Sequence, residues 1–261
     1  MSSLLSRAIS HRFVAATHPF RVRTADGVDL AGSRLGRGDP ALVLCHGFTG
    51  WHRKPRYGRL SDALARWFTV YGFDFRGHGA SGGLSTYGDL EINDVDAVVR
   101  LAREQGHGRV VTVGASMGGV AALRHAGLLG GVDAVVSVST PARWDGHRSR
   151  AVDRMTWLTA TVGGRRMARL GGLRLAGSWE SPETPAEVVG KIAPTPLLLV
   201  HGRDDHFFDE EEAWRLYRQA GEPKTLLLAS RFGHAEDGFD ERFAERVARW
   251  VFAAWGLPWP G

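Results

Sequence analysis

Short extended segments alternate along this chain with segments of helical periodicity, and this alternation restricts the folds open to it. Apolar residues recur at helical spacing over 89–104 and 239–252, between and after the later extended segments. Such alternation is typical of a mostly parallel sheet with helices on both faces, so we predict an α/β fold around eight strands. The expected strands are residues 20–24, 28–35, 41–45, 68–73, 109–114, 134–139, 196–200 and 224–228.

One serine directly follows an expected strand. The sequence Gly114-Ala115-Ser116-Met117-Gly118 separates the apolar run 110–113 from a helix-forming stretch at 120–129. A serine in so sharp a strand-to-helix turn has strained backbone angles, and the flanking glycines avoid clashes with the strand and the helix. The turn projects the hydroxyl into a cleft. Ser116 is therefore a candidate nucleophile, although in a chain with 34 glycines the surrounding sequence has to support the motif.

The loop after the strand at 41–45 is expected to reach the same cleft. It reads His46-Gly47-Phe48-Thr49-Gly50. A carbonyl group attacked by Ser116 develops negative charge on its oxygen, and two fixed backbone N–H groups would stabilise that charge by several kcal/mol. We assign this oxyanion hole to the N–H groups of Phe48 and Met117.

Acidic residues and a histidine follow in an order that suits the serine. The strand at 196–200 opens into His201-Gly202-Arg203-Asp204-Asp205, and the strand at 224–228 leads to Gly233-His234. A serine hydroxyl is a poor nucleophile at neutral pH, so His234 is expected to take its proton during attack. An aspartate of the acidic loop would hold the imidazole in the required tautomer.

Together these motifs resemble the α/β-hydrolase family, in particular its serine esterases, lipases and aminopeptidase-like members. The motifs are 46–48, Phe73-Asp74-Phe75-Arg76-Gly77-His78-Gly79-Ala80-Ser81, 114–119, and the pair 202–205 with 233–234. The resemblance extends over about residues 20–255. It implies the α/β-hydrolase fold, His234 as the base, and Asp205 as the triad acid with Asp204 as the near alternative.

The expected activity is hydrolysis of a carboxylic ester or thioester through an acyl-Ser116 intermediate. Water activated by His234 would release the acid, and this chemistry needs no cofactor. A peptidase or amidase acting on small substrates is the enzymatic alternative. A noncatalytic binding protein that kept the pocket is the alternative from another class, and the intact Ser116, Asp205 and His234 argue against it.

Residues 141–193 interrupt the alternation, after the strand at 134–139, where this family inserts a cap over the cleft. We expect a short helical cap within a single domain of residues 1–261. Trp144 and Trp157 are its expected substrate contacts. Eight arginines lie between 143 and 174 against two aspartates, which leaves two interpretations. They form a solvated face of the cap, or they attract an anionic substrate such as an acyl carrier protein.

Composition limits which other functional classes are compatible with the chain. With 261 residues, 43% of them hydrophobic, the chain can bury the core of one α/β domain. Cys45 is the single cysteine, so an internal disulfide is excluded, and we expect its side chain to be buried. We also expect a cytoplasmic protein. No apolar run approaches the length of a membrane span, and no nucleic-acid-binding motif accompanies the net charge of +5. The histidines and aspartates of 201–206 share one loop without metal-site spacing, so no metal is expected.

Overall fold

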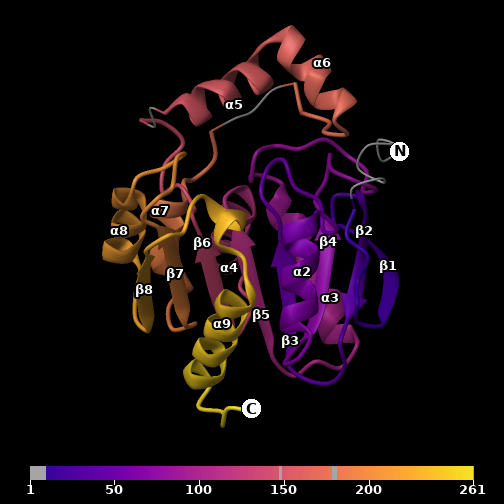
Figure 1. Ribbon diagram of the computed structural model, residues 1–261, viewed down its shortest axis with the longest axis vertical. Helices are drawn as coiled ribbons and strands as arrows, with labels where there is room; N and C mark the ends of the chain where they lie inside the picture. Colours follow the sequence, from indigo (N-terminus) through magenta and orange to yellow (C-terminus); the bar gives the residue numbers. More distant parts are fainter. Residues whose placement is uncertain (1–9, 147–148, 178–180, 261) are drawn as a thin grey trace.

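Eight strands form one sheet in the computed structural model, which describes residues 10–146, 149–177 and 181–260 (Figure 1). The strand order is β1-β2-β4-β3-β5-β6-β7-β8. β2 is antiparallel to β1 and to β4, and all other neighbours are parallel, which confirms the predicted sheet. The strands are Thr17–Arg23 (β1), Asp29–Leu35 (β2), Ala41–Cys45 (β3), Thr69–Asp74 (β4), Val110–Ala115 (β5), Ala134–Val138 (β6), Leu197–Gly202 (β7) and Lys224–Ala229 (β8).

Most strand boundaries differ from the sequence-based expectation by one to three residues, and two of these differences have a clear physical reason. β1 starts at Thr17 rather than at residue 20, because it pairs with the whole of β2 as far as Leu35. Its first three residues are exposed and give no apolar pattern. β6 ends at Val138 because the next residue, Ser139, has a φ of 50° and leaves the extended conformation.

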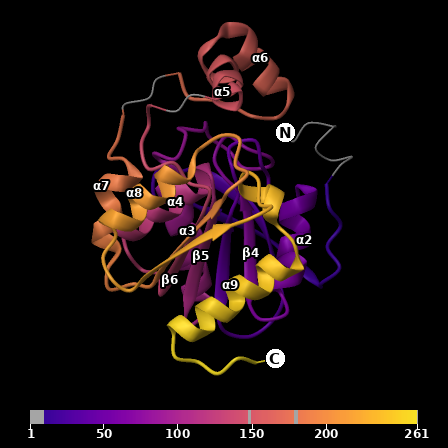
Figure 2. The ribbon, with the colours of Figure 1, turned by 60° about the vertical axis from the view of Figure 1, so that its left-hand side comes forward.

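Helices cover both faces of the sheet (Figures 1 and 2). α2 and α9 pack together on one face, while α3, α4 and α8 share the core on the other. No helix in the described part of the chain is both long and apolar enough to cross a membrane. The helices are Pro55–Leu64 (α2), Glu91–Glu104 (α3), Met117–Leu128 (α4), Arg150–Ala160 (α5), Val162–Leu170 (α6), Pro185–Val188 (α7), Glu210–Gln219 (α8) and Glu241–Ala254 (α9), with 3₁₀ turns at Val189–Ile192 (η1) and Ala235–Gly238 (η2).

The segment between β6 and β7 leaves this layered body and returns to it. α5 and α6 lie beyond the carboxyl ends of the strands, at the top of Figures 1 and 2, and contact each other. α7 and η1 then pack against α4. The Ala186 amide donates to the Ala142 carbonyl at 3.0 Å, so the two ends of the part that carries α5 and α6 lie side by side. Residues 141–193 therefore contain two parts, one above the edge of the sheet and one on its face.

Candidate active site

Ser116 lies in the turn between β5 and α4, with a φ of 52° and a ψ of −118°. Such a conformation costs about 1–3 kcal/mol in a residue with a side chain, so the surrounding structure has to impose it. The Ser116 amide donates to the Val138 carbonyl at 2.9 Å, and the Ser116 carbonyl accepts from the Val120 amide at 2.9 Å. One bond ties the turn to β6 and the other starts α4, and together they fix the position of the serine.

Two glycines allow this turn to pack closely. A β-carbon at Gly114 would collide with the backbone of Gly118, and a β-carbon at Gly118 would collide with the carbonyl groups of Cys45 and His46. Only glycine has no β-carbon to place there. The first turn of α4 therefore contacts the loop after β3, which brings the two expected oxyanion segments together.

Asp205 and His234 form a hydrogen-bonded pair at the carboxyl end of β7. His234 Nδ1 lies 2.8 Å from Asp205 Oδ2 and 3.0 Å from Oδ1. Asp205 Oδ1 also accepts from the amides of Phe207 and Phe208, at 2.8 and 3.1 Å. The neighbouring Asp204 is exposed, whereas the Asp205 side chain is 1% exposed. The structure thus places Asp205, rather than Asp204, against the histidine.

The surroundings of Asp205 favour its ionised form. Burial of the carboxyl group opposes the charge, but the hydrogen bond and the charge of His234 outweigh it, with help from the two backbone amides. The pKa of Asp205 is therefore held below its ordinary value. A carboxylate at Nδ1 keeps the proton of the neutral imidazole on that nitrogen and leaves Nε2 free to accept one.

Ser116 and His234 line one cavity of about 230 Å³. Their described side chains have no hydrogen bond to each other, and such bonds are often long until substrate binds. The ring of Phe207 packs against the imidazole of His234, with 4.4 Å between the ring centroids, and this contact helps to fix the orientation of the imidazole. The cavity also receives polar side chains: Thr49, Lys54, Glu236 and Asp237.

The expected oxyanion groups lie beside the serine. Met117 is the first residue of α4, and the first N–H groups of a helix have no partner within the helix. Phe48 follows Gly47, whose own amide donates to the Tyr57 hydroxyl at 2.8 Å. Tyr57 is buried in α2, and nothing in its local sequence indicates that it fixes this loop.

Two buried histidines shape the same loop without entering the cavities. His46 Nδ1 donates to the Gly47 carbonyl at 2.7 Å and Nε2 accepts from the Phe75 amide at 3.0 Å, so the ring is neutral. Burial lowers the pKa of His46 to about 3. His78 Nε2 lies 2.5 Å from the Phe48 carbonyl. His78 therefore positions Phe48.

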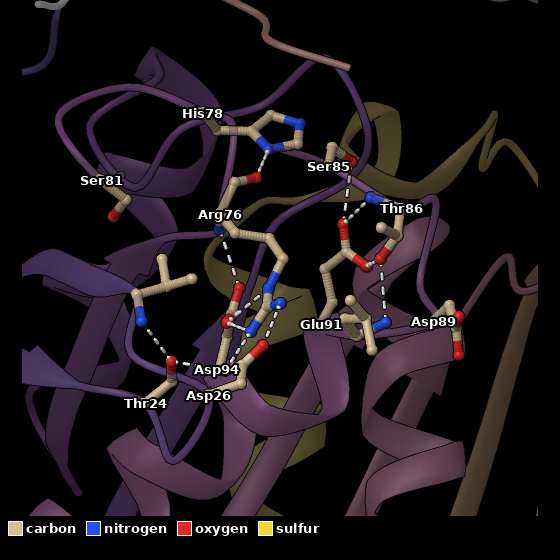
Figure 3. Close-up of polar contacts among 12 residues, drawn as sticks. Thr24, Asp26, Arg76, His78, Ser81, Ser85, Thr86, Asp89, Glu91 and Asp94 are labelled. Carbon is tan, nitrogen blue, oxygen red and sulfur yellow. Dashed lines mark hydrogen bonds and ion pairs between the residues drawn. The ribbon is translucent and has the colours of Figure 1, made fainter. Parts of the chain in front are cut away.

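A buried ionic network supports the segment that carries His78 (Figure 3). The Arg76 guanidinium donates to Asp94 and to Asp26 at 2.7–2.9 Å, and the Arg76 amide donates to Asp94 at 2.8 Å. Burial opposes the charge of Arg76, but its hydrogen bonds to both aspartates raise its pKa, so the guanidinium stays charged. Beside it, Glu91 accepts from Ser85, Thr86 and the Gly88 amide at 2.7–2.9 Å. The network fixes the chain between β4 and α3 next to the oxyanion loop.

A second, larger cavity of about 590 Å³ lies between the edge of the sheet and α5. Ser116, Phe48 and Met117 line its inner end. Most of its wall is apolar, which is typical of a ligand pocket. The wall includes Val120, Val152, Met155, Phe207 and Phe208.

Two residues expected to contact substrate lie in different places. Trp144 lines the larger cavity, and its indole N–H donates to the Pro182 carbonyl at 2.6 Å. Trp157 lines neither cavity that reaches Ser116; it lies on α5 with 47% of its surface exposed. Arg165 also lines the larger cavity and donates to the Thr159, Leu175 and Ala176 carbonyls. No described carboxylate forms an ion pair with Arg165.

The remaining ligand-type side chains form no metal site in the part of the chain that the structure describes. Within it, no group of three or more His, Cys, Asp or Glu side chains is placed to hold a metal ion. Cys45 is fully buried in β3, and burial raises the pKa of its thiol. A protonated, inaccessible thiol is a poor nucleophile.

Comparison with known proteins identifies the family. A model described as "Alpha/beta hydrolase family" matches residues 42–259, so the chain belongs to the alpha/beta hydrolase family. The uncharacterized protein YqkD of Bacillus subtilis is 31% identical over 83% of this chain and 72% of its own length. The uncharacterized protein YfhR of Escherichia coli K12 is 28% identical over 88% of this chain and 78% of its own.

Solved structures show the same fold. The esterase Pf2001 of Pyrococcus furiosus superposes with a TM-score of 0.75 at 22% identity, over 97% of this chain and 95% of that one. A putative aryl esterase from Burkholderia cenocepacia gives a TM-score of 0.75 at 20% identity, over 92% and 100% of the two chains. The predicted α/β-hydrolase fold is confirmed, and the chain is similar in fold to esterases.

Proposed function

We propose that this chain is a serine hydrolase that cleaves a carboxylic ester or thioester through an acyl-Ser116 intermediate. The proposal depends above all on one arrangement: a serine in a strained turn and an aspartate-paired histidine that line the same cavity. A strained turn persists only where the fold enforces it. A buried carboxylate behind a histidine is the arrangement that makes imidazole a general base.

In the first half of the reaction, Ser116 Oγ forms a bond to the carbonyl carbon and its proton passes to His234 Nε2. The electron pair of the carbonyl π bond moves to oxygen, where the N–H groups of Phe48 and Met117 stabilise it. Collapse of this intermediate breaks the bond to the leaving oxygen or sulfur, which takes the proton from His234. Water then repeats the sequence, releasing the acid and returning the proton to Ser116.

The two cavities suit the two halves of the substrate. His234 protonates the leaving group, so the leaving group has to lie on the histidine side, in the smaller cavity, whose wall includes Lys54 and Glu236. The acyl group is then left for the larger, apolar cavity beneath α5. On this assignment α5 and α6 act as a cap whose inner face, including Val152 and Met155, contacts the acyl chain.

The proposal is tested with the purified full chain and chromogenic esters, thioesters and amides of graded acyl length. A fluorophosphonate probe should label the protein once, at Ser116. Ser116→Ala should fold normally, resist labelling and lose at least about 10⁴-fold in kcat. Ser181→Ala, which changes an exposed serine, is the matched control and should retain full activity.

The outcome also separates the alternative functions. Turnover of amides in preference to esters would replace the esterase assignment by an amidase or peptidase. Failure of the folded wild-type chain to turn over any substrate or to react with the probe would favour a noncatalytic binding protein. Substantial activity in Ser116→Ala would refute the covalent mechanism.

A further inference from the structure

The outward faces of α5 and α6 combine exposed apolar side chains with exposed arginines. In a globular chain, large apolar side chains gathered on one exposed surface mark a site of interaction. Here they lie on the two helices that stand furthest from the body of the molecule (Figures 1 and 2). The apolar members are Leu170, Val162, Met167 and Trp157, with 81%, 71%, 58% and 47% of their surfaces exposed.

These side chains are not needed for the core or for the cavities. In α6 the buried positions are Gly164 and Ala168. Val162, Arg166 and Leu170 follow one another at four-residue spacing and project from a different face. In α5, Val152 and Met155 line the larger cavity, whereas Trp157 is exposed and lines neither cavity that reaches Ser116. Each helix therefore turns one set of side chains toward the body of the molecule and a second set, which includes large apolar side chains, toward solvent.

The charge on this outer surface is strongly positive. The helices α5 and α6 contain one acidic residue, Asp153, which is exposed. None of the arginines on this surface forms an ion pair with a residue that the structure describes. The exposed arginines of the two helices are Arg150, Arg154, Arg166 and Arg169.

We propose that this cap face, formed by Trp157, Val162, Met167, Leu170 and the four exposed arginines, binds the surface of an anionic lipid bilayer. Amphipathic helices with arginines around Trp and Leu lie in the plane of the bilayer interface, where apolar side chains enter the acyl boundary and arginines meet anionic headgroups. A bilayer satisfies both properties of the face together.

Charge argues against the other occupants of such a face. A second copy of this chain would bring its own four exposed arginines, with one aspartate, against the same four across a self-complementary interface, and like charges oppose that contact. A nucleic acid would match the arginines but would leave Leu170 and Val162 with no apolar partner. The anionic bilayer is the occupant that the face fits best.

The test measures binding of the full chain to vesicles by co-sedimentation. Vesicles of phosphatidylcholine mixed with phosphatidylglycerol should bind the chain, and vesicles of phosphatidylcholine alone should bind it far more weakly. Arg166→Gln with Arg169→Gln should lower the partition coefficient about fivefold per arginine removed. The matched control, Arg242→Gln with Arg246→Gln, removes the same charge from α9 at the opposite end of the molecule and should leave binding unchanged (Figure 1).

A second variant tests the apolar half of the proposal at constant charge. Val162→Thr with Leu170→Gln should lower the partition coefficient about tenfold, because two exposed apolar side chains no longer enter the bilayer. Circular dichroism checks that each variant folds.

Three results would overturn the proposal. They are equal binding to both kinds of vesicle, equal loss in the α9 control, and no loss in the apolar variant. Self-association of the chain that this apolar variant abolishes, without vesicle binding, would assign the face to a second copy instead. Because vesicle binding is read without substrate, the result does not depend on the proposed hydrolase activity.

Discussion

Replacing Asp205 by asparagine tests the proposed triad at the hydrogen bond between the acid and the histidine. The asparagine would keep the shape of the buried side chain, and its oxygen would still accept from the amides of Phe207 and Phe208. The new NH₂ group would then face His234 Nδ1, where a carboxylate oxygen lies 2.8 Å away in the wild type. A donor at this position stabilises the tautomer with its proton on Nε2, and that tautomer cannot accept the proton of Ser116.

We expect kcat to fall about 10⁴-fold, equivalent to about 5.4 kcal/mol at 1.36 kcal/mol per tenfold change. The assay is hydrolysis of a chromogenic ester near neutral pH, with the folded state checked by thermal unfolding. Asp204→Asn is the control, because the Asp204 side chain is exposed and the described contacts of His234 do not include it; its kcat should be unchanged. A loss below tenfold in Asp205→Asn, or a larger loss in Asp204→Asn, would refute the assignment of the acid.

Two further substitutions probe the surroundings of the site. Arg76→Met should reduce the free energy of unfolding, measured by urea titration, by about 3–5 kcal/mol, because it leaves the fully buried Asp94 without its cation. The control Arg100→Met removes an exposed ion pair and should reduce it by less than about 1 kcal/mol. Equal effects of the two would contradict the role given to the buried network. Arg165→Gln should lower kcat/KM about tenfold for an ester with an anionic acyl chain and leave kcat/KM for a neutral ester of the same length unchanged. Arg166→Gln, which changes an exposed arginine, should leave kcat/KM unchanged for both esters. An equal loss for both esters in Arg165→Gln would make Arg165 a structural residue.

The sheet was predictable because buried parallel strands carry a strong local signal. β3, β5, β6 and β7 are buried throughout, so nearly every residue in them has to be apolar or small. The turn at Ser116 was predictable for a related reason, since its glycines are required by close backbone contacts. Local sequence carries information wherever the constraint is local.

The rest depends on contacts between distant parts of the chain. Asp26 and Arg76 are fifty residues apart, and nothing near either residue indicates the partner. Trp157 shows the same limit in a helix: periodicity identifies an amphipathic segment, but α5 has two apolar directions and only the packed structure shows which one meets the cavity. The hydroxyl of Tyr57 and the ring of His78 fix the oxyanion loop from other elements for the same reason.

The hydrogen bond between Ala186 and Ala142 closes the segment between β6 and β7 at its base. β6 and β7 are neighbouring parallel strands, so the chain has to cross from the carboxyl end of β6 to the amino end of β7, and α7 and η1 make that crossing along α4 after the Ala142–Ala186 contact. Doubling the length of a closed loop adds only about 0.6 kcal/mol to its entropic cost. The residues between Ala142 and Ala186 can therefore be exchanged for a segment of another length or sequence while the strands that carry Ser116 and lead to Asp205 and His234 stay in place, provided that the backbone bonds of Arg174 to Gly77 and Ser85 are kept. The architecture separates the evolution of substrate range from that of bond cleavage, and it marks this junction as the place to graft a new cap.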